Sequence, residues 1–553
     1  AAMHVGAAIA QSLEAHHVSH VFMVPGESFL AVLDGMHDSS IASVVCRHEG
    51  GAAYAAEAHG KATGRAGVAM VTRGPGAANA KIGVYTAWQD EVPLILFVGL
   101  VPVKDRYRES FQEFDINVWF GDITKGVFVV DDAQRASRVV ANAFHLAQSG
   151  RRGPVVVGLP EDVLLEEFTG EIAGPMATAQ GAVADHDIAI ITEALRGARA
   201  PLIFEGGQGW TQQACDAVQS FAERYSIPVV NDMRSTDRIN FDSPANAGWL
   251  GTARNEETAR LLEEADVLLC IGAKLWDKPT DNFTLRQSLD AVNIVVNSDA
   301  GLKGSSGALT HHVLADPHAF AQVIDEIALD SKPDTTQWFA KARNIHAEFS
   351  AIPAPEERFA NLPEGAVDFY HVLEQVTARL DDTALTAFGA GNHCFWPQRF
   401  FPTRRFPSML APRLGSMGYS VAAGLAANLA LPERTVVVFA GDGELLMNGQ
   451  EIVTAVRYEA PMLIVVVDNQ QYGTIRAHQE KHFPGRVEGT QLSNPDFAAW
   501  SQAMGAWAET VSRDDEVDGA VQRAFAALDD AHVAVLHVIV DQDHATPEGS
   551  AQA

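Results

Sequence analysis

The stretch "VVVFAGDGELLMNGQEIVTAVRYEAPMLIVVVDNQQYG", residues 436–473, decides the fold. Two apolar runs, each long enough for a buried strand, flank a segment with apolar residues at helical spacing. The first run breaks at Gly441–Gly443 and the second at Asp468–Asn469. We therefore predict a βαβ unit, in which the carboxyl ends of both strands meet at the edge of the sheet where ligands bind. The predicted strand, helix and strand cover residues 434–440, 448–459 and 462–467.

Oxygen-bearing side chains stand at both strand tips, Asp442 after the first strand and Asn469 after the second. Gly441 and Gly443 leave backbone N–H groups free to approach an anion at the start of a helix. Two oxygen ligands beside a phosphate cradle suit Mg²⁺, which usually takes few protein groups plus phosphate oxygens and water. Two unrelated turns are the alternative, and finding both halves together at this spacing argues against it.

The same pattern extends over the whole chain. Near-continuous apolar runs alternate with helical stretches, which indicates parallel strands covered on both faces. Gly/Ala-rich residues 169–187 and Pro-rich residues 350–365 separate three such blocks. We predict an α/β protein of three doubly wound, mainly parallel-sheet domains over residues 1–168, 185–340 and 360–545. The apolar runs begin at residues 20, 68, 93 and 153, then 200, 228, 266 and 293, then 383, 434, 461 and 534.

Composition excludes several classes of function. The 553 residues carry a formal net charge of −30, which argues against nucleic acid or an anionic membrane surface as a partner. No apolar run is long enough to span a membrane. The amino-terminal stretch lacks a basic leader and is typical of an amphipathic helix. Four scattered cysteines without a CxxC pair favour reduced thiols and a cytoplasmic protein, at positions Cys46, Cys215, Cys270 and Cys394.

The Gly-Asp-Gly and Asn pattern resembles the thiamine diphosphate signature. Further segments are similar to the acetolactate synthase branch of that family, and the resemblance spans nearly the whole chain. It implies a pyrimidine-binding first domain, a middle domain, a diphosphate-binding third domain, and the cofactors thiamine diphosphate and Mg²⁺. The segments are "RHEGGAAYAAEAHGKATGRAGVAMVTRGPGAAN" (47–79), "FQEFD" (111–115), "GPVVVGLPEDV" (153–163) and "LGSMGY" (414–419).

The resemblance assigns roles on the cofactor side. Glu49 would hydrogen-bond N1′ of the aminopyrimidine and share the proton that activates the cofactor. Met417 would prop the cofactor in its bent form, although a core methionine is the plain alternative. Asp442, Asn469 and the Gln471 carbonyl would bind Mg²⁺, with Asp468 standing where the family usually has Asn. The remaining cofactor-binding residues implied are Pro25, Gly391, Asn392, His393, Gly415, Gly441, Gly443, Glu444, Tyr472, Gly473, Thr474 and Ile475.

Substrate-side positions depart from the acetolactate synthases. Glu27 stands where those enzymes have Gly, and it could shuttle protons to the enamine or simply cap a helix. Glu161 replaces a lysine, His478 a tryptophan, and Lys278 an arginine that helps select the second 2-oxo acid. We infer the same activation chemistry with a different substrate or acceptor. Phe111, Gln112 and His478 are the predicted pocket residues, and Glu27, Glu49, Gln112 and His478 the predicted catalytic ones.

The implied reaction is 2-oxo acid decarboxylation, followed by protonation or carboligation of the enamine. Strict acetolactate synthesis, a C–C lyase or hydrolase that releases no CO₂, and a non-catalytic paralogue are the alternatives. The resemblance also implies a homodimer or a dimer of dimers, with active sites at the subunit interface. The stretches that contact flavin in the synthases are poorly matched at residues 248–255 and 272–281, so FAD is not expected.

Overall fold

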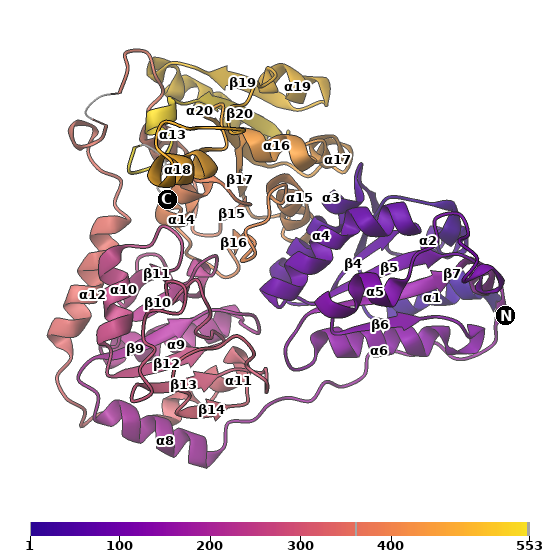
Figure 1. Cartoon of the computed structure of the whole chain (residues 1–553), viewed down its shortest axis with the longest axis horizontal. Coiled ribbons are helices and arrows are strands. Elements are labelled where there is room, and N and C mark those ends of the chain that lie inside the picture. The colour runs from indigo at the N-terminus through magenta and orange to yellow at the C-terminus, as the bar shows by residue number, and fades with distance from the viewer. Residues whose placement is uncertain (1, 360–361, 550–553) are drawn as a thin grey trace.

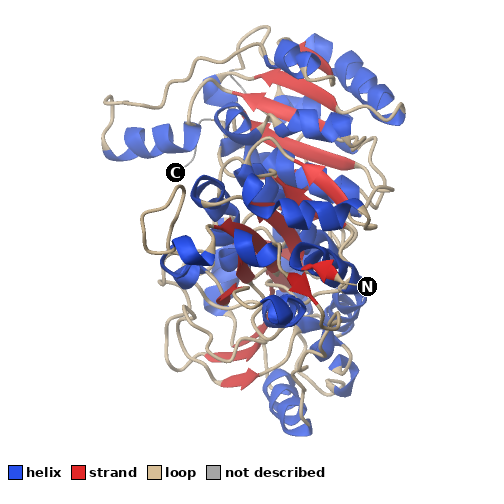
Figure 2. Cartoon of the chain, turned by 90° about the vertical axis from the view of Figure 1, so that its right-hand side faces the viewer, coloured by secondary structure: helices blue, strands red, loops and turns tan. Residues whose placement is uncertain are grey.

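Three six-stranded parallel sheets form the framework of the computed structural model, which describes residues 2–359 and 362–549 (Figure 1). Helices cover both faces of the sheets (Figure 2). The sheet pairing confirms three α/β domains in series along the chain. Of the predicted domain bounds, residues 1 and 360 lie outside the described residues.

The first sheet has the strand order β3-β2-β4-β5-β7-β6. Apolar clusters fill both of its faces, one under α1, α2 and α6 and the other under α3 and α4. A short antiparallel pair, β1 (Met3–His4) and β8 (Glu167–Phe168), joins the two ends of the domain. The strands are β2 (His20–Met23), β3 (Ala42–Val45), β4 (Gly67–Val71), β5 (Leu94–Leu100), β6 (Gly126–Val129) and β7 (Pro154–Pro160), and the helices α1 (Val5–Ala15), α2 (Leu30–His37), α3 (Glu49–Thr63), α4 (Gly74–Asp90), α5 (Ile116–Phe120), α6 (Ala136–Gln148) and α7 (Glu161–Leu164).

The middle sheet has the order β11-β10-β9-β12-β13-β14. Its strand order reverses between β9 and β12, which is where open α/β sheets usually bind ligands. Its strands are β9 (Pro201–Glu205), β10 (Val229–Asp232), β11 (Asn246–Leu250), β12 (Val267–Ile271), β13 (Val292–Val296) and β14 (His311–Val313), and its helices α8 (Asp185–Arg196), α9 (Gln212–Arg224), α10 (Glu256–Glu264), α11 (Pro317–Ala321) and α12 (Thr336–Phe349).

The third sheet has the order β16-β15-β17-β18-β20-β19. The opening stretch of sequence supplies its two central strands. The helix between them differs from the prediction, because it begins directly at Asp442 and breaks at Gly449–Gln450 into α16 and α17. Its strands are β15 (Leu385–Phe388), β16 (Met409–Leu410), β17 (Val436–Gly441), β18 (Leu463–Asp468), β19 (Trp507–Val511) and β20 (Ala534–Ile539), and its helices α13 (Phe369–Thr377), α14 (Phe395–Phe400), α15 (Ser420–Ala430), α16 (Asp442–Asn448), α17 (Glu451–Arg457), α18 (Gly473–His482), α19 (Phe497–Ala503) and α20 (Val517–Asp529).

The first and third domains share one core. Helix α3 packs along α15, and a single apolar cluster runs through both helices into both sheets. Tyr54 of α3 and Tyr419, just before α15, meet edge to face with ring centroids 5.4 Å apart. These two domains therefore form a continuous packed unit within one chain.

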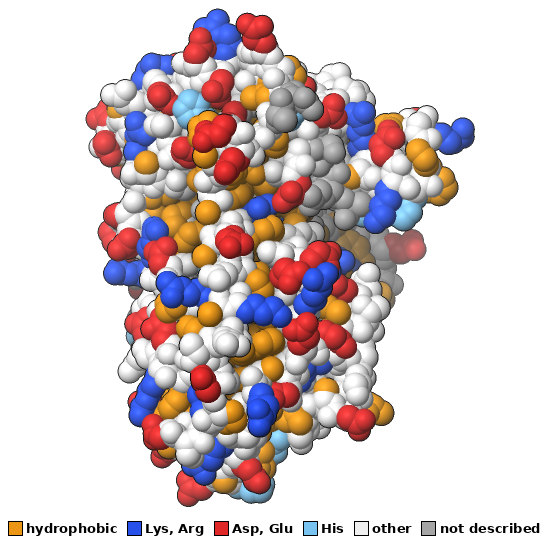
Figure 3. Space-filling model, turned by 90° about the vertical axis from the view of Figure 1, so that its left-hand side faces the viewer, with side chains coloured by type: hydrophobic (Ala, Val, Ile, Leu, Met, Phe, Trp, Pro, Cys, Tyr) orange, Lys and Arg blue, Asp and Glu red, His pale blue; other side chains and the backbone are white. Residues whose placement is uncertain are grey.

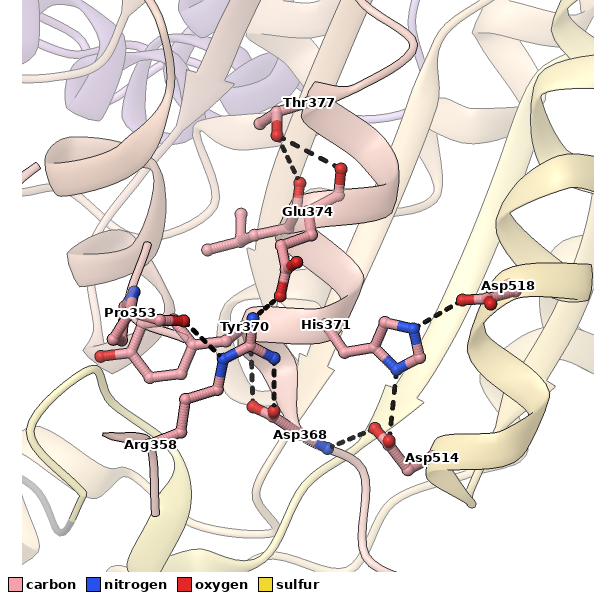
Figure 4. A network of polar contacts seen from close by, with 10 residues as sticks. Pro353, Arg358, Asp368, Tyr370, His371, Glu374, Thr377, Asp514 and Asp518 are labelled. Atoms are coloured by element: carbon pink, nitrogen blue, oxygen red, sulfur yellow. Dashed lines mark hydrogen bonds and ion pairs between the residues drawn. The ribbon is translucent and has the colours of Figure 1, made fainter. Parts of the chain in front are cut away.

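The segment 350–365, which connects the middle domain to the third domain, is anchored to the third domain through Arg358 (Figure 4). Its guanidinium pairs with Asp368 at 2.9 Å and with Glu374, and it donates to the Pro353 carbonyl. On the other side of α13, His371 lies between Asp514 and Asp518 of the α20 region. The connection is therefore tied to α13, and α13 to α20.

The structure shows how charge, apolar helices and cysteines are distributed. On the face shown in Figure 3, Lys and Arg are interspersed with Asp and Glu and form no single basic patch. In the parts of the chain that the structure describes, no helix combines the length and apolarity that a membrane crossing needs. All four cysteines are buried, and each has a free thiol.

Glu205 is a buried carboxyl at the reversal point of the middle sheet. Its side chain is fully buried, and neither oxygen has a hydrogen-bond partner among the described residues. Burial raises the pKa of Glu205 well above its ordinary value, Arg238 opposes this rise, and Asp237 adds to it. Burial therefore favours the protonated form of this carboxyl in the folded protein.

Replacing Glu205 with Gln is expected to make stability less dependent on pH. An unfolded Glu releases its proton above about pH 4.3 whereas the folded protein keeps it, so the free energy of unfolding falls as pH rises. Gln has nearly the same size and cannot titrate. Thermal unfolding from about pH 5 to about pH 8 should show the variant gaining stability relative to the original protein as pH rises. Parallel pH profiles would contradict the assignment.

Candidate functional site

A cavity of about 250 Å³ opens at the carboxyl ends of β15, β17 and β18. The two tips predicted from the opening stretch, Asp442 and Asn469, both line it. All its lining residues come from the third domain, and they include fourteen of the predicted cofactor residues plus Gln471. The remaining lining residues are Ala390, Val467 and Ala545.

Three oxygens converge at one end of the cavity. Oδ1 of Asn469 lies 2.8 Å from the Gln471 carbonyl and 3.0 Å from Oδ1 of Asp442, and no hydrogen lies between these atoms. A cation held between the three oxygens would stabilise this arrangement, and one carboxylate, one amide and one carbonyl are a donor set that suits Mg²⁺ beside phosphate oxygens. With the Asn469 amide turned over, its NH₂ would donate to both neighbours. The donor set therefore fits the ion.

A second layer of residues fixes the Asp442 carboxylate. Asn494 donates to Oδ2 of Asp442 at 2.7 Å and to Oδ1 of Asp468 at 2.9 Å, which leaves Oδ1 of Asp442 facing the other two oxygens. His537 pairs with the other oxygen of Asp468 at 2.8 Å. Burial by itself raises the pKa of Asp468, but the hydrogen bonds from His537 and Gln470 bring it below its ordinary value. The extra charge of Asp468 is therefore held by its own partners.

Glycines let backbone approach the cavity from three sides. A Cβ on Gly441 would lie 2.6 Å from the His393 ring, one on Gly443 2.5 Å from the Tyr472 ring, and one on Gly473 2.1 Å from Nδ2 of Asn392. Gly473 is also the first residue of the ten-residue helix α18, whose first-turn N–H groups have no partner within the helix. This end of the cavity is therefore suited to a phosphate group.

His393 and Glu444 form a buried ion pair in the wall of the cavity. Nε2 of His393 lies 2.7 Å from Oε2 of Glu444. Burial disfavours the charged imidazole, but the Cys394 sulfur and the Glu444 carboxylate raise the pKa of His393 to about 10. The ion pair is neutral as a whole, and its imidazole ring lies beside Gly441, at the end of the cavity suited to phosphate. Nδ2 of Asn392, buried nearby, has no hydrogen-bond partner among the described residues and is free to donate to a ligand.

Glu49 does not line this cavity. It is the first residue of α3, at the carboxyl-end edge of the first sheet, where Nδ2 of Asn79 donates to its Oε1 at 3.2 Å. A Cβ on Gly76 would lie 3.3 Å from its other oxygen. The predicted activating carboxyl is thus not brought to the cavity that the predicted metal ligands line within one chain.

Two substrate-side departures meet at Arg73. This buried arginine, at the tip of β4, pairs with Glu161 at the end of β7. Its other terminal nitrogen lies 3.6 Å from Glu27, whose side chain is 73% exposed. Glu27 and Glu161 therefore share one cation at the same sheet edge as Glu49, and a lysine in place of Glu161 would face Arg73 with like charge.

The loop that carries Phe111 and Gln112 lies over the same edge. The Gln112 carbonyl accepts a hydrogen bond from Gly74 N, at the start of α4. Tyr107, Glu109 and Gln112 all have positive φ angles of 52–64°, which are strained for residues other than glycine. Phe111 is 74% exposed on its own chain.

Other predicted residues lie apart from the cavity. His478 is exposed on α18, one turn beyond the cavity-lining Ile475, and its ring stacks with His482 at 6.4 Å. Lys278 is exposed in the middle domain. Pro25 is exposed near Glu27 at the edge of the first sheet. None of the three touches the cavity within the described chain.

Sequence reasoning missed Asn494 and Arg73. Asn494 lies in the loop after α18, and Arg73 lies within the segment 47–79, which carries part of the family resemblance. No local pattern marks Asn494. Arg73 carried a weak signal, since a cation directly before Gly-Pro-Gly ends a buried strand.

Comparison with known proteins agrees with this geometry. Family models described as the N-terminal TPP binding domain, the central domain and the C-terminal TPP binding domain of thiamine pyrophosphate enzymes match residues 3–118, 188–324 and 389–538. The chain is similar to the acetolactate synthase isozyme 2 large subunit of Escherichia coli K12, with 29% identity over 97% of this chain and 95% of that protein. It is also similar to the acetolactate synthase large subunit of Parasynechococcus marenigrum, with 30% identity over 90% of this chain and 82% of that protein. These matches show that the chain belongs to the thiamine pyrophosphate enzyme family, in its acetolactate synthase-like branch.

Proposed function

We propose that this protein binds thiamine diphosphate with Mg²⁺ and decarboxylates a 2-oxo acid. The fragment left after CO₂ departs is protonated to an aldehyde or joined to a second carbonyl compound. The observation that carries the proposal is the convergence of Asn469, Asp442 and the Gln471 carbonyl beside a glycine-lined cavity. A cation and a phosphate group are both suited to that end of the cavity.

Different lining residues would bind Mg²⁺ and the diphosphate. Asp442, Asn469 and the Gln471 carbonyl would hold Mg²⁺, and Asn392, His393 and the first turn of α18 would hold the diphosphate. When bound, thiamine diphosphate supplies a carbon nucleophile and an electron sink. Met417 would support the bend of the cofactor, and the carboxyl of Glu49 would hold a proton at N1′ of the aminopyrimidine.

The active site is proposed to be completed by a second copy of the chain. A cavity of about 250 Å³ is below the roughly 300–1,000 Å³ typical of a whole small-molecule site, and no residue of the first domain lines it. Large apolar side chains are exposed near both halves of the site, which is typical of a surface that another chain covers. A homodimer or dimer of dimers would bring Glu49 of one chain to the cavity of the other. The exposed side chains are Tyr107, Phe111 and Val118 on the first domain, and Leu446, Met447 and Ile475 on the third.

The substrate is proposed to meet Glu27, with Phe111, Gln112 and His478 as further pocket residues. Arg73 lies between Glu27 and Glu161, so these two departures from the synthases form one arrangement. A carboxylate held at the mouth of the site is suited to moving a proton to or from the substrate carbon after CO₂ leaves. This supports a reaction whose product or acceptor differs from that of the synthases.

The middle domain is proposed to work without flavin. At its reversal point, Glu205 and Gly272 form a backbone bridge across β9 and β12. A Cβ on Gly207 would lie 2.1 Å from the Gly272 carbonyl, so the backbones after β9 and β12 approach each other closely at this point.

Strict acetolactate synthesis from two molecules of pyruvate is the second candidate. The names of the relatives favour it, since they are acetolactate synthase large subunits. The replacements at Glu161, His478 and Lys278 favour the first proposal instead.

Release of CO₂ from a panel of 2-oxo acids, with Mg²⁺ and thiamine diphosphate present, tests the function. We expect one acid to release CO₂ and to give an aldehyde or a mixed ligation product, identified by mass. Acetolactate from pyruvate as the main product would establish the second candidate. If no acid released CO₂ while the C2 proton of the bound cofactor still exchanged, decarboxylation would be refuted. A lyase or hydrolase acting on ketols, diketones or acyl thioesters would then be the reading to test.

A further inference from the structure

Helix α3 touches two different functional elements. Its first residue is Glu49, the proposed activating carboxyl. Farther along, the Tyr54 hydroxyl donates to the Met417 carbonyl at 3.0 Å, and Oε2 of Glu57 accepts from the Tyr419 hydroxyl at 2.6 Å. Met417 lines the cavity of the same chain, whereas Glu49 does not. Helix α3 therefore contacts Met417, the residue proposed to support the cofactor bound by its own chain. It also carries Glu49, the carboxyl proposed to act in the active site of the partner.

These contacts are buried and are reinforced by neighbours. Tyr54 is 1% exposed, and Glu57 and Tyr419 are fully buried. Lys61, one turn farther along α3, pairs with Glu57 at 3.4 Å and donates to the Ala411 carbonyl at 2.7 Å. The first domain thus makes hydrogen bonds to both ends of the segment 411–419, which leads into the cavity.

Helix α4 holds the same segment from its other side. Oδ1 of Asp90 accepts from Arg413 N at 2.7 Å, and the hydroxyls of Thr86 and Ser416 are 3.1 Å apart. Met417 is the part of the segment whose position matters for the cofactor, and its backbone carbonyl is held by Tyr54.

The segment depends on these contacts because its backbone is otherwise free to turn on both sides of Met417. Gly415 and Gly418 have φ angles of +70° and +90°, in the left-handed region that favours glycine. A hydrogen bond to the carbonyl between two such glycines restrains the backbone from which the Met417 side chain projects.

We propose that Tyr54 is a positioning residue that sets Met417 for the cofactor bound by its own chain. This inference rests on the proposed function. Because Glu49 begins the same helix, α3 is then a physical link between the two active sites of a dimer. The geometry makes a directional statement, since the Tyr54 hydroxyl acts on the site of its own chain and Glu49 acts on the site of the partner.

Tyr54→Phe removes one hydroxyl and keeps the buried ring. The Met417 carbonyl then loses its donor, and Met417 no longer has a fixed orientation. We expect exchange of the cofactor C2 proton at the affected site to slow about tenfold. The near-UV circular dichroism of the bound aminopyrimidine should change, while thermal unfolding without cofactor should stay close to that of the parent.

Mixed dimers with a single competent site give the sharpest test. A chain with Glu49→Gln keeps an intact cavity, and a chain with Asp442→Ala supplies an intact Glu49, so a dimer of the two has one complete site. Tyr54→Phe is then placed either on the Glu49→Gln chain, whose Met417 serves that site, or on the Asp442→Ala chain, whose α3 carries the serving Glu49. Thr86→Val, placed in the same two ways, is the matched control for losing a hydroxyl contact to segment 411–419.

The inference predicts slower exchange and altered circular dichroism only when Tyr54→Phe lies on the Glu49→Gln chain. Thr86→Val should have a smaller effect in either place. Equal loss in both placements, or loss only on the Asp442→Ala chain, would overturn it. If the mixture of Glu49→Gln and Asp442→Ala chains, both with Tyr54 intact, showed no C2 proton exchange, the shared active site itself would be refuted, and the inference with it. The two failures are therefore distinguishable.

Discussion

Replacing Glu49 with Gln is expected to slow exchange of the C2 proton of bound thiamine diphosphate by about 10²- to 10⁴-fold. In the proposed function the carboxyl at this position holds a proton at N1′, and an amide of the same size cannot share one. Glu49 lies at the sheet edge against Gly76 and Asn79, where Gln would fit without repacking. Quenched-flow exchange followed by NMR of the cofactor measures the effect directly and requires no knowledge of the substrate.

Glu27→Gln is the matched control, because it makes the same change at another carboxylate on the same edge. Glu27 is proposed to act on the substrate, so C2 exchange should stay within about twofold while the product distribution changes. C2 exchange that survives in Glu49→Gln would show that another group activates the cofactor.

Removing the metal carboxylate with Asp442→Ala is expected to weaken binding of thiamine diphosphate by about 100-fold or more, since losing even an outer partner of a metal ligand costs about 10- to 100-fold. Two oxygens would remain at the site, the Asn469 amide and the Gln471 carbonyl, and neither carries a charge. Calorimetric titration with and without Mg²⁺ measures the loss. In the variant, the affinity should no longer respond to Mg²⁺.

Asp468→Asn is the control for charge alone. Asp468 lies next to the metal residues in sequence, yet its oxygens are engaged by Asn494 and His537. We expect binding of thiamine diphosphate to weaken by about tenfold at most, which is the lower end of the loss caused by removing an outer partner of a metal ligand. A larger loss from Asp468→Asn than from Asp442→Ala would mean that the metal ligands are assigned to the wrong carboxylate.

The central strands of each sheet could be predicted from sequence because they are buried on both faces and are continuously apolar. The strands missed are the two edge strands of every sheet, β3, β6, β11, β14, β16 and β19. These edge strands escaped prediction for different reasons. β3 and β19 are only partly buried, β11 carries Asn246 and Gly248 among its buried residues, and β16 has two residues. Edge strands carry mixed sequence because one side of the ladder is open.

The residues that line the cavity could be picked out from the sequence for a related reason. Its residues stand at strand tips and first helical turns, where a break in an apolar run marks the position in the sequence. Asn494, Arg73 and Tyr54 could not be found in this way. Asn494 reaches Asp442 from a loop, Arg73 is defined by carboxylates on two other strands, and Tyr54 on α3 is an ordinary buried position until Met417 is seen beside it. Such residues become visible only when separate segments are brought together.

The central claim is that the activating carboxyl and the cofactor cavity come from different chains. Mixing the inactive Glu49→Gln and Asp442→Ala proteins under conditions that exchange subunits, and measuring C2 proton exchange, tests it most directly. Half of the dimers would be mixed and each would hold one complete site, so the claim predicts recovery of about a quarter of the original exchange capacity. A mixture that exchanges subunits and remains as inactive as its components would contradict it.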